Sequence, residues 1–200
     1  AITRYVDKED NAEYIYSLFV PSDVSTAFPV FDQPDLKAKF DLFINAPKGW
    51  KAVSNSLVNE YAASTKIGSS TKEEAEKFEK YNATREFFPF FETKPISTYV
   101  FAFAVGEFQT FYERSRDEVF NEVGDEHIKK YGGIAIEKID ADVDVRNPRI
   151  YVRKSQAEKF KQHSAEVFRL NREGVKYLES YFDYKFPYPK YYLVLIPEFP

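Results

Sequence analysis

The 200 residues are 44% hydrophobic and 30% charged and include 15 Tyr and 20 Phe, a composition that predicts a globular core and argues against disorder. The formal net charge of −4 comes from interspersed acids and bases, which argues against a nucleic-acid partner because phosphate contacts need a clustered basic face. There is no cysteine, which excludes disulfides and thiolate chemistry, and no apolar run is long enough for a membrane span.

The first elements in chain order are predicted to be strands. Tyr14–Val20 is rich in β-branched and aromatic residues and ends at Pro21, which cannot continue a ladder. Lys37–Ala46 alternates apolar and polar residues, as a half-buried strand does. Pro47–Trp50 is typical of a turn, and Lys51–Val53 follows it as a further strand. These last three segments predict a β-hairpin.

The middle of the chain mixes both kinds of element. Ser97–Val105 is apolar on both faces, which favours the interior of a sheet over an edge. The elements predicted for this middle part are helices over Lys72–Tyr81 and Asp125–Tyr131, and strands over Glu86–Thr93, Ser97–Val105, Ile136–Val145 and Ile150–Val152.

The character of the sequence changes at Ser155. Ser155 and Glu158 have the spacing of a capping box, and the apolar residues that follow recur at helical spacing for roughly seven turns. Gly174 lies inside this predicted helix and indicates a place where another backbone approaches. The stretch Tyr184–Pro189 ends the helix, and Tyr191–Ile196 is predicted to be an apolar strand of a covered sheet.

Four stretches carry a family resemblance: Phe28–Phe40 (FPVFDQPDLKAKF), Asn45–Asn55 (NAPKGWKAVSN), Pro95–Gly106 (PISTYVFAFAVG) and Leu178–Phe199 (LESYFDYKFPYPKYYLVLIPEF). In this order they resemble the aminopeptidase N family of zinc metallopeptidases. Several ordered matches are more specific than any single short motif.

The resemblance implies a mostly β fold with α elements. Residues 1–154 would be the later part of an antiparallel, saddle- or sandwich-like N-terminal β-domain. Residues 155–200, with their long helix and strand, would begin an α+β thermolysin-like catalytic domain and stop before its zinc site. The whole protein would bind zinc and release N-terminal amino acids from peptides, whereas this chain would hold no catalytic or metal-binding residue and be inactive alone. Its partners would be peptide substrates and the rest of its own catalytic domain.

One segment departs from the family pattern. Many members carry a T-Q-x-Q/E-P segment whose polar side chains hold the amine of the substrate, and Ser17–Pro21 is its counterpart here. Leu18 and Val20 therefore occupy the amide or acid positions, and the resemblance implies that they form an apolar wall of the substrate pocket. The alternative is that both belong to the core of the Tyr14–Val20 strand. Asp32 is expected to be structural, in an Asx/Pro turn.

Other polar groups have simpler explanations than chemistry. Zinc peptidases need two imidazoles and a carboxylate, and the chain has only His127 and His163. His163 with Glu166 is better interpreted as a solvated helix face. Three alternating carboxylates suit the wet face of a strand better than a calcium site: Asp140, Asp142 and Asp144.

Two other functions remain open on the sequence alone. One is a non-catalytic relative of the same architecture that serves in protein–protein assembly, and the other is a free-standing β binding module. The long helix and apolar strand after Ser155 argue against the module, because it has no use for them. An exposed apolar patch is also expected where absent parts of the whole protein would pack.

Overall fold

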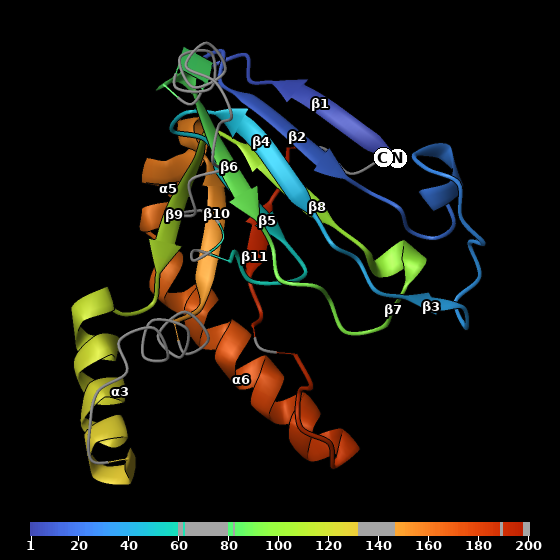
Figure 1. Cartoon of the computed structure of the whole chain (residues 1–200). Coiled ribbons are helices and arrows are strands. Elements are labelled where there is room, and N and C mark those ends of the chain that lie inside the picture. Colours follow the sequence, from blue (N-terminus) through green and yellow to red (C-terminus); the bar gives the residue numbers. More distant parts are fainter. Residues whose placement is uncertain (60–61, 63–79, 82, 132–146, 189, 198–200) are drawn as a thin grey trace, which may run out of the picture. The chain divides into compact units, whose positions relative to one another are not determined.

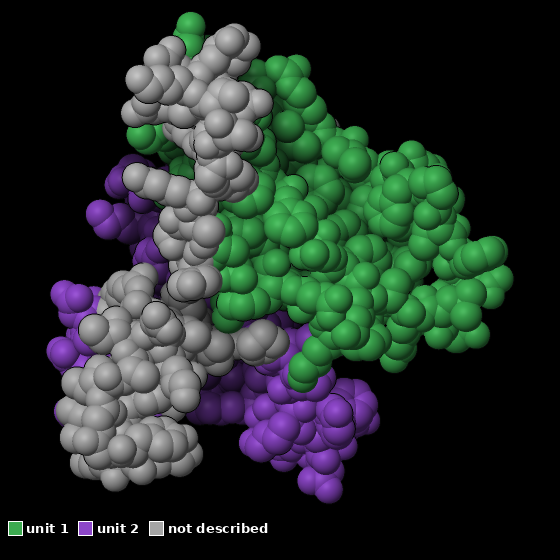
Figure 2. Space-filling model, viewed as in Figure 1, with its two compact units in different colours: residues 1–108 green, residues 109–200 purple. Residues whose placement is uncertain are grey.

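The computed structural model describes residues 1–59, 62, 80–81, 83–131, 147–188 and 190–197 (Figure 1). They form two compact units, residues 1–108 and 109–200, each described here by itself (Figure 2). The boundary expected after residue 154 separates two domains of the family. The division into compact units does not test it, so it stays a prediction. Within the described residues, no helix combines the length and the apolar character that a bilayer crossing requires.

Unit 1 is built around a four-stranded antiparallel sheet. Its strand order is β1 (Ile2–Val6), β2 (Glu13–Ser17), β8 (Phe103–Gly106) and β5 (Lys51–Ser54). Strand β8 lies between β2 and β5, which confirms an interior position for the end of the predicted Ser97–Val105 strand. The rest of that prediction is wrong, because a 3-10 turn, η2 (Thr98–Val100), separates β8 from the short strand β7 (Ile96–Ser97).

The predicted hairpin around Pro47–Trp50 is wrong in its pairing. The turn exists, with Gly49 at a φ of +88° that favours glycine. However, strand β4 (Phe43–Pro47) pairs with β6 (Arg85–Pro89), while β5 pairs with β8. The apolar faces of β4 and β5 meet in one core cluster through Ala46 and Ala52. The turn therefore joins two sheets across a core, because burying both apolar faces outweighs pairing with the nearest strand in sequence.

A second core cluster of unit 1 is formed by residues at or next to the ends of β2, the 3-10 turn η1 (Val24–Thr26), β7 and η2. Strand β3 (Lys37–Ala38) pairs with β7, and η1 follows β2. The predicted alternation over Lys37–Ala46 persists in burial, although the strand itself is interrupted between β3 and β4. The buried members of this cluster are Phe19, Val24, Ile96 and Phe101.

A substitution at Gly106 is expected to disrupt the pairing of β2 with β8. A Cβ atom there would lie 2.5 Å from the Glu13 carbonyl oxygen and 2.9 Å from the Tyr14 Cα, both main-chain atoms that cannot move alone. Gly106→Ala should lower the free energy of unfolding by about 1–3 kcal/mol, measured by urea denaturation. In the same chain Gly174→Ala should raise it by about 0.5–1 kcal/mol, because among the described residues a Cβ atom there meets no side chain and no distant main-chain atom within 4 Å. Equal effects at the two glycines would contradict the close packing at Gly106.

Unit 2 contains a three-stranded sheet with helices. The strand order is β11 (Leu193–Leu195), β10 (Arg149–Arg153) and β9 (Phe108–Tyr112), and β10 and β11 are parallel. Helix α3 (Arg116–Tyr131) follows β9 and includes the predicted Asp125–Tyr131 helix as its second half. Between β10 and β11 lie η3 (Lys154–Gln156), α5 (Ala157–Lys161) and α6 (Ser164–Phe182).

The long helix predicted from Ser155 is divided in two. Helix α5 ends at Lys161 and α6 begins at Ser164. The N-cap of α5 is Gln156, whose side chain makes no capping hydrogen bond, so the predicted capping box at Ser155 does not start this helix. The predicted stop is confirmed, since α6 ends at Phe182 with Asp183 in the left-handed conformation.

The mostly β fold class with a C-terminal helix is thus confirmed. Two predicted elements fall outside the described residues: the strand over Ile136–Val145 and nearly all of the helix over Lys72–Tyr81.

Candidate functional site

Leu18 and Val20 lie just beyond the end of β2. Leu18 is half-buried and Val20 is 60% exposed, whereas Phe19 between them is 2% exposed and belongs to the core. The structure therefore does not place Val20 in the core of the Tyr14–Val20 segment. The apolar side chain of Val20 is exposed to solvent, whereas Phe19 before it and Val24 after it are buried in one core cluster.

This segment, Leu18–Val24, is held in place by Asp32. The main-chain N–H of Asp23 donates to the Phe19 carbonyl at 2.9 Å, and the N–H of Val24 donates to Asp32 Oδ2 at 3.1 Å. The other carboxylate oxygen of Asp32 accepts a hydrogen bond from Thr98 Oγ1 at 3.0 Å. Asp32 thus joins η1 to η2. Its expected structural role is confirmed, but its carboxylate bonds Val24 and Thr98 and not a residue of the expected Asx/Pro turn.

The side chains of Leu18 and Val20 can contact a ligand but cannot take part in catalysis. Both oxygens of Asp32 accept hydrogen bonds from the protein, and Asp35 is an exposed residue of the following turn. Neither the Leu18 nor the Val20 side chain carries an oxygen that could accept a hydrogen bond from an amine. These two side chains can supply apolar surface to a ligand, and recognition of a charged amine would have to come from other groups.

The described part of unit 2 contains a groove of about 850 Å³. It lies between β9, the loop that follows it, the start of β10, and α5. Its lining is charged and aromatic: Gln109, Thr110, Phe111, Tyr112, Glu113, Arg114, Ser115, Asn147, Arg149, Lys154, Ala157, Glu158 and Lys161. Two of these side chains are held by ion pairs, Arg114 with Glu122 at 2.6 Å and Glu113 with Arg172.

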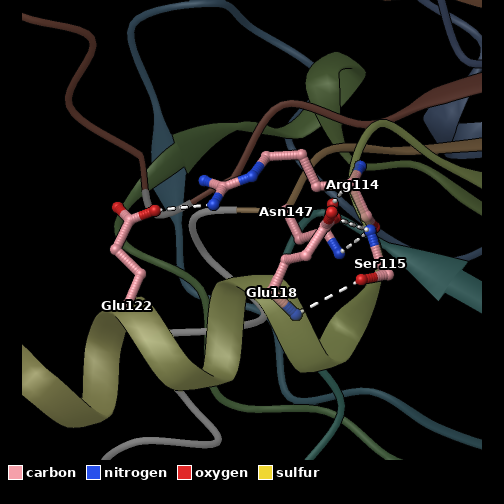
Figure 3. A network of polar contacts seen from close by, with 5 residues as sticks. All are labelled: Arg114, Ser115, Glu118, Glu122 and Asn147. Atoms are coloured by element: carbon pink, nitrogen blue, oxygen red, sulfur yellow. Dashed lines mark hydrogen bonds and ion pairs between the residues drawn. The ribbon is translucent and has the colours of Figure 1, made fainter.

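The polar contacts of the groove hold the loop between β9 and α3 (Figure 3). The buried side chain of Asn147 bonds both main-chain groups of Arg114, donating to its oxygen at 3.0 Å and accepting from its N–H at 3.4 Å. Ser115 and Glu118 form a capping box, since the Glu118 N–H donates to Ser115 Oγ at 3.2 Å and the Ser115 N–H donates to Glu118 Oε2 at 2.9 Å. These bonds start helix α3 and provide neither a nucleophile nor a general base.

Loss of the Ser115 hydroxyl is expected to weaken the start of α3. Ser115→Ala removes the acceptor of the Glu118 N–H, and such N-cap replacements cost about 1 kcal/mol. The change should be measured as a fall in the free energy of unfolding in urea. Ser180→Ala, at an exposed position inside α6, is the control and should be neutral or slightly stabilising. Comparable losses in the two variants would contradict the capping role of Ser115.

The capping box also predicts a pH dependence. The Ser115 N–H, followed by its hydroxyl, lowers the pKa of the Glu118 carboxyl below its ordinary value. A lowered folded pKa means that the stabilisation is present above the unfolded value of about 4.3 and is lost as the pH falls through the folded one. The difference in unfolding free energy between the chain and Glu118→Ala should therefore shrink from pH 7 towards pH 3. A constant difference would contradict a charge-dependent contact.

The described residues do not fit a zinc ion. His163 is exposed at the N-cap of α6, and Glu166 is held by two hydrogen bonds from Arg169, at 2.6 and 2.7 Å, which lower the pKa of its carboxyl. His127 lies in α3. The three carboxylates considered above for calcium fall outside the described residues: Asp140, Asp142 and Asp144. In the described part of the chain, no three His, Asp or Glu residues are grouped as metal ligands would be.

Comparison with known proteins identifies the first half of the chain. Residues 2–100 match the family model described as the peptidase M1 N-terminal domain. The chain is 29% identical to aminopeptidase N of Streptomyces lividans over 98% of its own length and 17% of that protein. It is 25% identical to glutamyl aminopeptidase of Sus scrofa, over 98% of this chain and 16% of the relative. A third relative, probable M1 family aminopeptidase 1 of Encephalitozoon cuniculi, is 33% identical over 65% of this chain and 13% of its own length.

The chain therefore spans less than a fifth of the length of the relatives that it matches. The match confirms the resemblance to the aminopeptidases that the four sequence stretches carry. This chain belongs to the peptidase M1 family, whose N-terminal domain its residues 2–100 match.

Proposed function

We propose that the whole protein is a zinc-dependent aminopeptidase that releases N-terminal amino acids from peptides, and that this chain serves as scaffold and as part of the substrate-channel wall. The observation that carries the proposal is the match of 98% of the chain to proteins named as aminopeptidases. The peptide substrates are thus assigned to the whole protein. Because the described residues do not fit zinc, the ligands would be supplied elsewhere in it.

The chain would contribute parts of two domains to that enzyme. Residues 1–154 would be the later part of the N-terminal β-domain, and residues 155–200 would open the catalytic domain. The family model supports the first assignment over residues 2–100. The parallel pair β10–β11, which encloses α5 and α6 in a βαβ unit, distinguishes the end of the chain from the antiparallel sheet of unit 1, and β10 itself lies just before residue 155. Leu18 and Val20 would form the apolar wall.

The assignment is tested by activity of the whole protein. Purified with zinc, it should hydrolyse aminoacyl-aminomethylcoumarin substrates, and 1,10-phenanthroline should abolish the activity. The 200-residue chain assayed alone should release no fluorophore. A whole protein without peptidase activity that binds another protein would overturn the proposal in favour of a non-catalytic relative. Activity in the chain alone would also overturn it.

The wall role of Val20 needs its own experiment. In the active whole protein, Val20→Gln should raise the KM for substrates with apolar N-terminal residues several-fold and leave kcat nearly unchanged, because uniform binding is lost. Val6→Gln is the matched control, since Val6 is an exposed valine on the outer strand β1. An unchanged KM in Val20→Gln, or an equal change in Val6→Gln, would exclude Val20 from the pocket.

A further inference from the structure

The exposed turn between Phe19 and Val24 is anchored by a buried side chain at each end. Phe19 is 2% exposed, and its ring contacts those of Phe28 and Phe101, with centroid distances of 6.1 and 6.3 Å. Val24 is fully buried in the same cluster. The four residues between the two anchors are all exposed, and Val20 is exposed to 60%. The turn can therefore present Val20 to a ligand only as precisely as the chain holds its backbone.

Main-chain hydrogen bonds define this turn, and Asp32 attaches its backbone to a different part of unit 1. The Asp23 N–H donates to the Phe19 carbonyl at 2.9 Å, which closes the turn. The next N–H, that of Val24, donates to Asp32 Oδ2 at 3.1 Å. Among the described residues, the other hydrogen bonds of the turn reach no further than Phe28. The carboxylate of Asp32 is therefore what connects the turn, through hydrogen bonds, to the chain beyond it.

A second hydrogen bond fixes the orientation of the Asp32 carboxylate. Its Oδ1 accepts from the hydroxyl of Thr98 at 3.0 Å, and Thr98 is 1% exposed in η2. The strand β7 before η2 pairs with β3, in the register of Ser97 opposite Lys37, so η2 is tied to the chain that follows Asp32. Turning the carboxylate away from Val24 would leave the buried Thr98 hydroxyl without this acceptor, which costs more than an ordinary hydrogen bond contributes. Asp32 therefore holds the Val24 N–H in one place.

The placement of Val20 determines how well this residue can bind a ligand. When a binding residue occupies its binding position for only a fraction of the time, the apparent affinity falls by that fraction. A segment that must first be ordered also lowers the affinity by the cost of ordering it. The bond between Val24 and Asp32 fixes the end of the turn, so its loss would let Val20 move. The buried side chains at both ends would still keep the segment in the fold.

We propose that Asp32 is a positioning residue for substrate binding, whose carboxylate holds the side chain of Val20 in the position where the substrate contacts it. This inference rests on the proposed function, which assigns Val20 to the wall of the substrate pocket. Asp32 does not touch the substrate and acts through the Val24 N–H and the turn before it. The wall contacts the substrate alike in the ground state and in the transition state, so loss of Asp32 raises KM and leaves kcat nearly unchanged.

Steady-state kinetics of the whole protein test this role. Asp32→Asn keeps one acceptor oxygen and should raise the KM for leucyl-aminomethylcoumarin by roughly three- to tenfold. The KM for the alanyl substrate should change by less than about twofold, because a methyl side chain makes little contact with the wall. Thr98→Val, which removes the hydroxyl that orients the Asp32 carboxylate, should cause a smaller change in the same direction.

Ser54→Ala is the matched control for a merely structural effect. The Ser54 hydroxyl is also a buried donor, with its bond to the Ala102 carbonyl at 2.8 Å, but it lies in β5 and does not contact the turn. Ser54→Ala should leave the KM of both substrates unchanged. An equal rise of KM in Ser54→Ala and Asp32→Asn, or a rise in Asp32→Asn that is the same for both substrates, would overturn the positioning role.

Hydrogen exchange followed by mass spectrometry locates the effect without any use of activity. In the whole protein, peptides that cover residues 19–27 should exchange at least roughly fivefold faster in Asp32→Asn than in the unsubstituted protein, and no faster in Ser54→Ala. Unchanged exchange in Asp32→Asn would overturn the role of Asp32, as would an unchanged KM in an active variant. An unsubstituted whole protein without peptidase activity would instead overturn the proposed function, and this role with it.

Discussion

Phe101→Ala is expected to lower the free energy of unfolding of unit 1 by about 3–5 kcal/mol, the range for removing a large aromatic side chain from a core. Phe101 is only 7% exposed and stacks on Phe40 with ring centroids 4.2 Å apart and planes 4° from parallel. The rings of Phe19 and Phe28 lie 6.3 Å away on other sides. Alanine would leave a cavity beside the rings of Phe19, Phe28 and Phe40.

Urea denaturation followed by circular dichroism measures this effect. Phe43→Ala is the matched control, because Phe43 is 57% exposed and its ring contacts Phe87 on the surface of the β4–β6 pair. The control should cost less than about 1 kcal/mol. If the two variants unfold at the same urea concentration, Phe101 is not central to this core.

Asp32→Ala is expected to destabilise unit 1 by about 2–4 kcal/mol, because two polar groups lose their acceptor at once. Thr98, whose hydroxyl donates to Asp32, is 1% exposed, and Val24, whose main-chain N–H donates to Asp32, is fully buried. Asp32→Asn keeps one acceptor oxygen and should lose roughly half as much.

A nearby carboxylate and a compensating change make this prediction specific. Asp35→Ala, at an exposed position of the same turn, should be within about 0.5 kcal/mol of the unsubstituted chain. Adding Thr98→Val to Asp32→Ala should recover part of the loss, since the stranded hydroxyl is then absent. A loss in Asp32→Ala no larger than in Asp35→Ala would show that the carboxylate does not join η1 to η2.

Two S-x-x-E patterns of the chain, at Ser115 and at Ser155, illustrate the limits of local signals. Ser115–Glu118 forms a reciprocal capping box at α3, whereas Ser155–Glu158 has the same spacing and does not cap α5. Only the second was predicted from the sequence, although the signal at Ser115 was equally readable. The pattern shows that a cap is available, and the rest of the chain decides whether the backbone there begins an α-helix or, as at Ser155, a 3-10 turn.

Hydrogen bonds between residues that are far apart in the sequence could not be predicted from the sequence. Asp32 was correctly expected to be structural from its Asx/Pro context, but its bond to Thr98 joins residues 66 positions apart. The sequence also did not indicate that Leu170, Tyr177 and Tyr181 of α6 would be exposed. Gly174 was interpreted as a close approach of another backbone, and among the described residues nothing lies within 4 Å of a Cβ atom placed there.

Local chemistry in the sequence was enough to predict the mostly β composition, the turn at Gly49, the end of α6 near Phe182 and the M1 family resemblance. Each depends on residues close together in the chain or on an ordered set of stretches. Only the tertiary structure decided that β4 pairs with β6 and β5 with β8, that the predicted Ser97–Val105 strand breaks at η2, and that Val20 faces solvent while Phe19 is buried. The reason is that pairing and burial minimise the free energy of the whole core, where apolar faces distant in sequence compete for the same contacts.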